Sequence, residues 1–281
     1  MNYLKTGILL VVLTMLLVWI GGMIGGQQGM VTAFIFALLM NFGVYFFSDK
    51  IVLAMYRAQE IAEAKMPELY AIVRELTSEA NIPMPKLYMV PQNAPNAFAT
   101  GRNPKHAVVC VTSGIMDILS RDELKGVLAH ELAHVKNRDT LIMTITASVA
   151  GAIMMIANMA RWAAIFGTGG RDRNRGNSNL IGLLIVSILA PLAAMIIQLA
   201  ISRTREYAAD NRGARFAHSP YGLANALKKL DESTRYRSLN ASPQTAHMFI
   251  VNPLRGEGVM NLFSTHPPIK ERVRRLEGMS I

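Results

Sequence analysis

Cysteine and charge are both scarce in this 281-residue chain, which has one cysteine and 17% charged residues. The single Cys110 excludes an internal disulfide, and this fits a protein that works in a reducing compartment. It lies in a short apolar run, where we expect it to pack as a small apolar strand residue. Hydrophobic residues make up 51% of the chain, which is too much for an ordinary soluble protein and indicates membrane segments.

Acidic residues are also few, so that 29 Lys and Arg against 19 Asp and Glu give a net charge of +10. The basic residues concentrate in residues 48–138 and 202–281, which is typical of parts that lie close to the cytoplasmic face of an anionic bilayer. They are scattered among acidic residues, and no dense basic run carries interleaved aromatic residues. We therefore expect contact with a lipid bilayer and no binding of nucleic acid.

Four apolar segments are long enough to cross a bilayer as helices, each having about 20 residues. They cover residues 7–26, 29–47, about 141–166 and 180–201. A cleaved signal peptide is the alternative for the first segment, but its apolar run is long and no Ala-x-Ala site follows it. We therefore expect two transmembrane hairpins, over 1–47 and 139–201.

The two hairpins place the charged parts, 48–138 and 202–281, on the same side of the membrane. The excess of Lys and Arg predicts that this side is the cytoplasm. Arg171, Arg173 and Arg175 in the connector of the second hairpin would then lie outside, against the usual charge rule. A hairpin that enters the bilayer without crossing it would remove this conflict, although four spans remain the favoured interpretation.

The two charged parts read as helix-rich, with few strands. Strands are predicted over 86–90 and 106–112, and Ser120 with Glu123 forms a capping box ahead of a long helix. The fold class is therefore α+β, with a short β-sheet in a domain that is split by the second hairpin. Helices are predicted over 50–65, from Pro67 to before Asn81, from Ser120 towards the third apolar segment, and over 202–217, 220–236 and 267–277.

The strongest functional signal is a His-Glu-x-x-His motif, with His130 and His134 on the predicted helix before the third apolar segment. Histidines four residues apart lie on one helix face and can reach one metal ion, while Glu131 can contact a water molecule on that metal. The motif therefore predicts a zinc hydrolase in which Glu131 transfers the proton. A helix with two surface histidines is the alternative.

A catalytic zinc ion usually has three protein ligands and one water molecule, so a third ligand is needed. Glu206 is the best candidate, because it lies five residues after the fourth apolar segment and His134 lies seven before the third. Both groups are then about 8–10 Å from the membrane boundary. Asp210, one helical turn further, either accepts a hydrogen bond from a zinc histidine or forms an ion pair with Arg203 or Arg205 on a solvated helix face. His266 and Arg272 are candidate donors to the oxyanion.

Taken together, the motifs resemble those of the HtpX family of membrane zinc metalloproteases, over essentially the whole chain. This family belongs to the gluzincin group, which includes the CAAX prenyl proteases. The shared motifs are Met66 to Leu69, Asn96 to Gly101, Val127 to His134, Ser202-Arg203, Glu206-Tyr207, Ala209-Asp210, Ser264 to Pro268 and Arg272.

The resemblance implies a zinc endopeptidase with one zinc ion, held by His130, His134 and Glu206, and with Glu131 as the catalytic glutamate. It also implies that His266 and Arg272 face the substrate or the oxyanion. Asn96 and Ala97 are implied to line the cleft, where an extended substrate adds as an edge strand. The implied role is quality control of membrane proteins and unfolded polypeptides in the cell inner membrane, with the site facing the cytoplasm.

Two other classes of protein compete with this interpretation. A zinc-stabilised membrane adaptor could bind misfolded proteins without cleaving them, but a structural zinc site normally has four protein ligands and does not need Glu131. A basic membrane protein that binds lipid or nucleic acid, with an accidental motif, is the third possibility.

Overall fold

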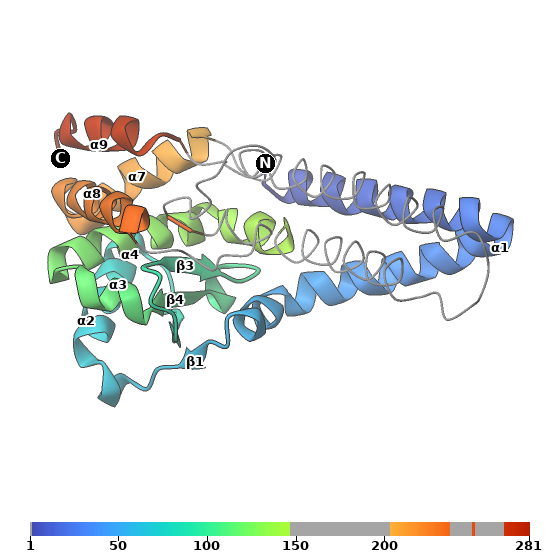
Figure 1. The fold of residues 1–281 in the computed structure, drawn as a ribbon, viewed down its shortest axis with the longest axis horizontal. Helices are drawn as coiled ribbons and strands as arrows, with labels where there is room; N and C mark the ends of the chain where they lie inside the picture. Colours follow the sequence, from blue (N-terminus) through green and yellow to red (C-terminus); the bar gives the residue numbers. More distant parts are fainter. Residues whose placement is uncertain (1, 147–202, 237–248, 251–266) are drawn as a thin grey trace.

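The molecule has a helical hairpin at one end and a helix–sheet part at the other (Figure 1). In this computed structural model, residues 2–146, 203–236, 249–250 and 267–281 are described. The predicted α+β, helix-rich fold with a short sheet is confirmed in these residues. The predicted hairpin over 139–201 lies almost entirely outside them.

The N-terminal hairpin is formed by helix α1, Asn2–Met55, which is interrupted by non-helical backbone at Gly25 and Gly26. Gly26 has φ 57° and ψ −142°, a conformation that a residue with a side chain rarely adopts. The two arms contact each other, since the Asn41 side-chain amide donates a 2.8 Å hydrogen bond to the Thr14 hydroxyl. The break lies at the last two residues of the first predicted segment, whereas the sequence placed the separation at residues 27–28.

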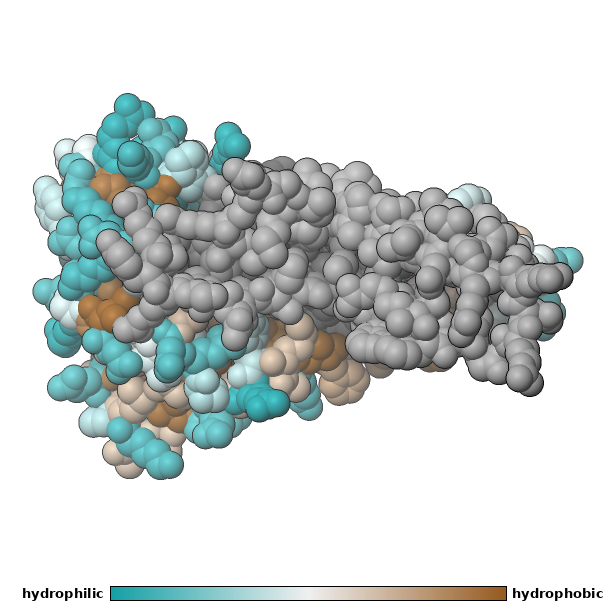
Figure 2. All heavy atoms as spheres, in the orientation of Figure 1, coloured by the Kyte–Doolittle hydropathy of each residue, from teal (hydrophilic) through white to brown (hydrophobic). Residues whose placement is uncertain are grey.

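The second arm of α1 is the one described helix that is long and apolar enough to cross a membrane, over Gly25–Phe47. Figure 2 shows that hydrophilic side chains gather instead over the end of the molecule that carries the helix–sheet part. Four membrane spans are thus not confirmed by the described residues.

A four-stranded mixed sheet follows α1, with the strand order β1-β2-β4-β3. β2 and β4 are parallel, with Leu87 opposite Val109, and the other two pairs are antiparallel. β3 is therefore an edge strand. The four strands are β1 Gln59–Glu60, β2 Lys86–Val90, β3 Ala97–Thr100 and β4 Val108–Thr112.

Two local predictions were wrong or incomplete. The helix predicted over 50–65 ends at Met55, because Arg57 turns the chain with φ 51° and Ile61 then donates a backbone hydrogen bond to Leu87. The sequence also gave no signal for β3, whose four residues are all buried and whose apolar and polar residues do not alternate.

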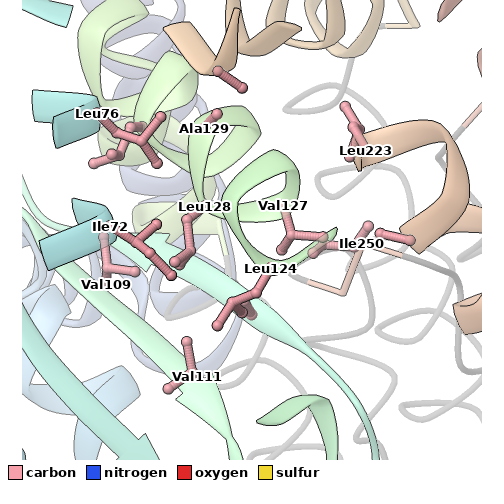
Figure 3. Close-up of a cluster of buried hydrophobic side chains, with 14 of the residues drawn as sticks. Ile72, Leu76, Val109, Val111, Leu124, Val127, Leu128, Ala129, Leu223 and Ile250 are labelled. Atoms are coloured by element: carbon pink, nitrogen blue, oxygen red, sulfur yellow. The ribbon is translucent and has the colours of Figure 1, made fainter. Parts of the chain in front are cut away.

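Helix α4, Arg121–Asn137, lies at the centre of the helix–sheet part and contacts α2, α7, α8 and β3. Its predicted capping box between Ser120 and Glu123 is confirmed. Figure 3 shows Val127 and Leu128 of α4 in the buried cluster, with Ile72 of α2 and Val109 of β4. The other helices are η1 Glu63–Lys65, α2 Pro67–Ala80, η2 Pro104–His106, α3 Ser113–Ile118, α7 Arg203–Ala217, α8 Tyr221–Tyr236 and α9 Ile269–Glu277.

The contact between α4 and α7 is unusually close at Gly213. A Cβ atom at this position would lie 2.8 Å from the backbone nitrogen of His130, which is closer than real side chains come. The absence of a side chain at Gly213 therefore lets α7 approach the turn of α4 that carries His130. This approach brings the acidic residues of α7 to the two histidines.

Candidate metal centre

Three side chains from two helices converge in the interior of the helix–sheet part. His130 and His134 project from α4 and Glu206 from α7, and all three are buried. The Nε2 atoms of the two histidines are 3.2 Å apart. Glu206 Oε1 lies 3.4 Å from His134 Nε2, and Glu206 Oε2 lies 3.7 Å from His130 Nε2.

These separations suit a zinc ion. Tetrahedral ligands at the usual zinc distances of about 2.0–2.1 Å are separated from one another by about 3.3 Å. The three observed separations lie close to that value. Two imidazoles and one carboxylate are also a donor set that catalytic zinc sites use, so the residues present fit the predicted metal.

The other nitrogen of each histidine ring is held by a carboxylate. His130 Nδ1 lies 2.9 Å from Asp210 Oδ1, and His134 Nδ1 lies 3.1 Å from Asp139 Oδ2. A hydrogen bond at Nδ1 fixes the ring orientation and leaves the Nε2 lone pair for a metal. The carboxylates thus prepare both rings for metal binding before any ion arrives.

The pKa of His134 reflects these charged neighbours. Burial disfavours the charged ring, but the hydrogen bond to Asp139 and the charges of Glu206 and Glu131 raise the pKa of His134 to about 9. A proton and a metal ion therefore compete for this ring at neutral pH, and metal binding should release a proton.

Glu131, the next residue after His130, is buried and tied to the edge strand. Its Oε2 atom accepts a 3.0 Å hydrogen bond from the backbone N–H of Ala99 in β3. Burial raises the pKa of the Glu131 carboxyl, although the two histidines oppose this effect. A raised pKa makes this carboxylate a better proton acceptor, and the bond to Ala99 fixes its orientation.

Arg272 in α9 lies fully in the interior, with 0% of its surface exposed. Its Nε and Nη2 atoms donate hydrogen bonds of 2.9 and 2.7 Å to the two oxygens of Asp210. Burial disfavours the charge of Asp210, but Arg272 outweighs this and lowers the pKa of Asp210 to about 2. Of the two roles considered for Asp210, the contact with a histidine of the metal cluster is present. The ion pair that Asp210 forms is a buried one with Arg272 of α9, which differs from the solvated pair considered with Arg203 or Arg205.

The remaining predicted site residues are placed as follows. Asn96 is buried immediately before β3, and Ala97 is the first residue of that strand. Arg272 Nη2 lies 3.5 Å from both ring nitrogens of His130, so α9 reaches the metal cluster. His266 lies outside the described residues. The structure thus brings together the predicted site residues of α4, α7 and α9, while Asn96 and Ala97 lie at the start of β3, the strand whose Ala99 binds Glu131.

Sequence reasoning missed Asp139, five residues after His134. That spacing does not place two residues on one face of a continuous helix. Arg138 takes a left-handed conformation with φ 60° and ψ 33°, which ends α4 before residues 139–146 continue as a helix. The only local signal was the sequence Asn137-Arg138, since asparagine is common where helices end.

The sequence of this chain is similar to those of known proteins. Residues 63–280 match the profile of peptidase family M48. The chain belongs to peptidase family M48. Family membership makes it a metalloprotease, and the resemblance to the HtpX family is confirmed by relatives that match over the full chain.

Several relatives bear the name protease HtpX homolog. The protein from Thermodesulfovibrio yellowstonii is 59% identical, covering 100% of this chain and 99% of the relative. The protein from Syntrophobacter fumaroxidans is 58% identical with 98% of both chains covered, and that from Pyrococcus furiosus is 55% identical with 99% and 96% covered. The crystal structure of S. mikatae Ste24p shares the fold, with a TM-score of 0.51, 16% identity, and 95% of this chain and 62% of that chain covered.

Proposed function

We propose that this M48 protein is a zinc endopeptidase of the cell inner membrane that cleaves misfolded or damaged membrane proteins on the cytoplasmic side. One observation carries the proposal: His130, His134 and Glu206 converge in the interior while Glu131 is held by the edge strand. In the described residues the cluster has three members, which leaves room for water as a fourth ligand. A structural zinc site in an adaptor would normally have four protein ligands.

His130, His134 and Glu206 would hold the metal. When bound there, a zinc ion would lower the pKa of a water molecule and polarise a peptide carbonyl. Glu131 accepts the proton of the attacking water and passes it to the nitrogen of the leaving amine. The Ala99 N–H holds Oε2 of Glu131 by a hydrogen bond. We therefore infer that Oε1 is the atom that accepts the proton.

The membrane location is supported by the apolar surface of the α1 hairpin and by the Gly25–Phe47 segment. We propose four spans, with the second hairpin over 139–201, and a cytoplasmic helix–sheet part. A reporter fused at position 170 tests this topology. A periplasmic signal supports two further crossings, whereas a cytoplasmic signal contradicts them and supports a hairpin that enters without crossing.

Cleavage by the purified full chain with zinc tests the activity, with an unfolded polypeptide or a membrane protein as substrate. We expect Glu131→Gln to lower the rate about 10²–10⁴-fold without changing the zinc content, because it removes proton transfer and no metal ligand. Glu206→Gln should lower the zinc content as well. Glu232→Gln, at an exposed glutamate of α8, is the matched control and should behave like the wild type. Equal rates for the wild type and Glu131→Gln would refute the mechanism.

A further inference from the structure

The backbone of Ile250 is held from both sides by two residues that the family resemblance assigns to substrate. Its N–H donates a 3.2 Å hydrogen bond to Oδ1 of Asn96, and its carbonyl accepts a 3.2 Å hydrogen bond from Nη1 of Arg272. Both partners are almost fully buried, with exposed fractions of 1% and 0%. Ile250 therefore occupies the hydrogen-bonding groups of Asn96 and Arg272 that a bound substrate peptide would otherwise contact.

Residues 249–250 form a bend whose two side chains enter different hydrophobic clusters. The aromatic ring of Phe249 packs near Tyr56 in the cluster that contains Phe98 and Cys110, on one face of the sheet. Ile250 belongs to the cluster on the other face, which contains Ala97 and Val109, and Figure 3 shows it beside Val127. The bend is tied to the start of the edge strand β3, because Ile250 donates its hydrogen bond to Asn96, the residue before that strand.

This dipeptide is close to the metal cluster. The guanidinium that binds the Ile250 carbonyl through Nη1 also lies 3.5 Å from His130 through Nη2. On the edge strand, Ala99 holds the catalytic Glu131, three residues after Asn96. The carbonyl of Ile250 and the predicted zinc ligand His130 therefore contact the same guanidinium group. A peptide would have to lie at this distance from the metal cluster to be hydrolysed.

We propose that Ile250 is a built-in occupant of a substrate subsite, so that the protease is held back by its own chain until a polypeptide displaces residues 249–250. The proposal rests on the proposed function and deepens it. A substrate residue takes the place of Ile250, offers its N–H to Asn96 and its carbonyl to Arg272, and inserts its side chain into the hydrophobic cluster that contains Val127. Because this cluster is apolar, the subsite accepts a branched aliphatic side chain and rejects a charged one.

An intramolecular occupant lowers the apparent affinity for a substrate, because the substrate can bind only to molecules in which the occupant has left the subsite. The apparent dissociation constant is multiplied by the ratio of all molecules to those whose subsite is open. Weakening the hold on Ile250 should therefore tighten peptide binding, whereas loss of a merely structural contact would weaken or not affect it.

Peptide binding by the full-length Glu131→Gln protein in detergent with zinc tests this directly, since the peptide is not consumed. The probe is a fluorescent nine-residue peptide of alanines with a central isoleucine, measured by anisotropy, beside one with a central aspartate. We expect Ile250→Ala to bind the isoleucine peptide at least 10-fold more tightly than the parent, and the aspartate peptide to bind weakly to both. Ile115→Ala, an equally buried isoleucine in the same cluster, is the control and should not tighten binding. Unchanged or weaker binding by Ile250→Ala overturns the proposal.

A thiol at position 250 gives an independent readout that also decides the proposal if Ile250→Ala does not fold. The only natural cysteine, Cys110, is buried in β4, so its reaction with maleimide should be slow. In Glu131→Gln/Ile250→Cys, a saturating amount of the isoleucine peptide should speed the labelling of position 250 at least 10-fold. The aspartate peptide and an Ile115→Cys control should leave labelling unchanged. A bound isoleucine peptide that does not speed labelling would contradict displacement.

Failure of the proposed function has a different signature. If the wild type and Ile250→Ala bind the peptide and neither cleaves it with zinc present, the endopeptidase assignment is wrong although the subsite exists. If both cleave it with the same KM, hydrolysis stands and the self-occupied subsite is refuted. A KM at least 10-fold lower for Ile250→Ala, with kcat unchanged, supports both.

Discussion

The α1 hairpin and the helix–sheet part distribute their apolar and charged side chains in opposite ways. On α1 the large apolar side chains point outward, with Leu39 68% exposed, and a polar pair of Asn41 and Thr14 joins the two arms. In the helix–sheet part the interior holds Glu131, Asp210 and Arg272, and most exposed residues are hydrophilic. The hairpin is suited to lipid, and the other part is suited to water with a reactive interior.

The two regions differ in the free energy that is lost when one of their polar contacts is removed. A buried charge is expensive unless a partner compensates it, so the charges around the metal cluster are arranged in pairs. Asp210 contacts both His130 and Arg272, and Asp139 contacts His134. A hydrogen bond between two helices in a membrane contributes much less, because the separated helices find other partners. Single substitutions should therefore have large effects in one region and small effects in the other.

The largest loss of stability is expected from Arg272→Met, which leaves the carboxylate of Asp210 buried without its cation. The free energy of unfolding should fall by about 3–5 kcal/mol, measured by denaturant titration in detergent with circular dichroism. Arg274→Met on the same helix is the control. Its side chain is 78% exposed in an ion pair with Glu271, so the change should not exceed about 1 kcal/mol. Similar losses for both variants would mean that burial does not set the cost.

The next effect concerns zinc affinity and the residue that sequence reasoning missed. Asp139→Asn keeps the size of the side chain but removes the charge that orients and polarises His134. We expect about 10–100-fold weaker zinc binding, measured by competition with a chelating dye. Asp117→Asn, at an exposed position of α3, should bind zinc like the wild type. Unchanged affinity in Asp139→Asn would show that the contact with His134 does not support metal binding.

The stability of the metal-free protein should also depend on pH through Asp210. Its folded-state pKa of about 2 lies below the ordinary value of 3.8, so its ionised form stabilises the fold. This stabilisation is complete above pH 3.8 and is lost as the pH falls through 2, and it amounts to about 2 kcal/mol. Thermal unfolding of the wild type and of Asp210→Asn should therefore converge as the pH is lowered from 5 towards 1. A constant difference over this range would contradict the assignment.

The smallest effect is expected in the hairpin. Asn41→Leu removes the hydrogen bond to Thr14 and should change the free energy of unfolding by about 0.6 kcal/mol. The Asn41 carbonyl oxygen has no partner among the residues that the structure describes, which adds to the reason for a small effect. Phe42→Leu, an exposed neighbour, is the control. A loss above about 2 kcal/mol in Asn41→Leu would mean that the Asn41–Thr14 hydrogen bond contributes nearly as much stability as a buried ion pair. The two regions would then not differ in the effect of single substitutions.

Local patterns predicted a good part of this protein. The spacing of His130 and His134 depends only on the period of one helix, and so does the capping box of Ser120 and Glu123. The apolar segments of α1 follow from composition, which put the junction between them after residue 26, next to the observed break at Gly25 and Gly26. These features involve residues a few positions apart, so they could be derived without knowing how the elements pack.

The tertiary structure decided which charged groups serve the metal cluster and what occupies its neighbourhood. Arg272 and Asp210 are 62 positions apart, and Ile250 and Asn96 are 154 apart, so no periodic pattern relates them. Asp139 reaches His134 only because Arg138 leaves the helical conformation. The sequence by itself thus determined the family, the predicted zinc ligands and the apolar hairpin. Packing, through close approaches such as that of Gly213 to His130, determined the partners of those ligands, because contacts between distant segments depend on how whole helices fit together.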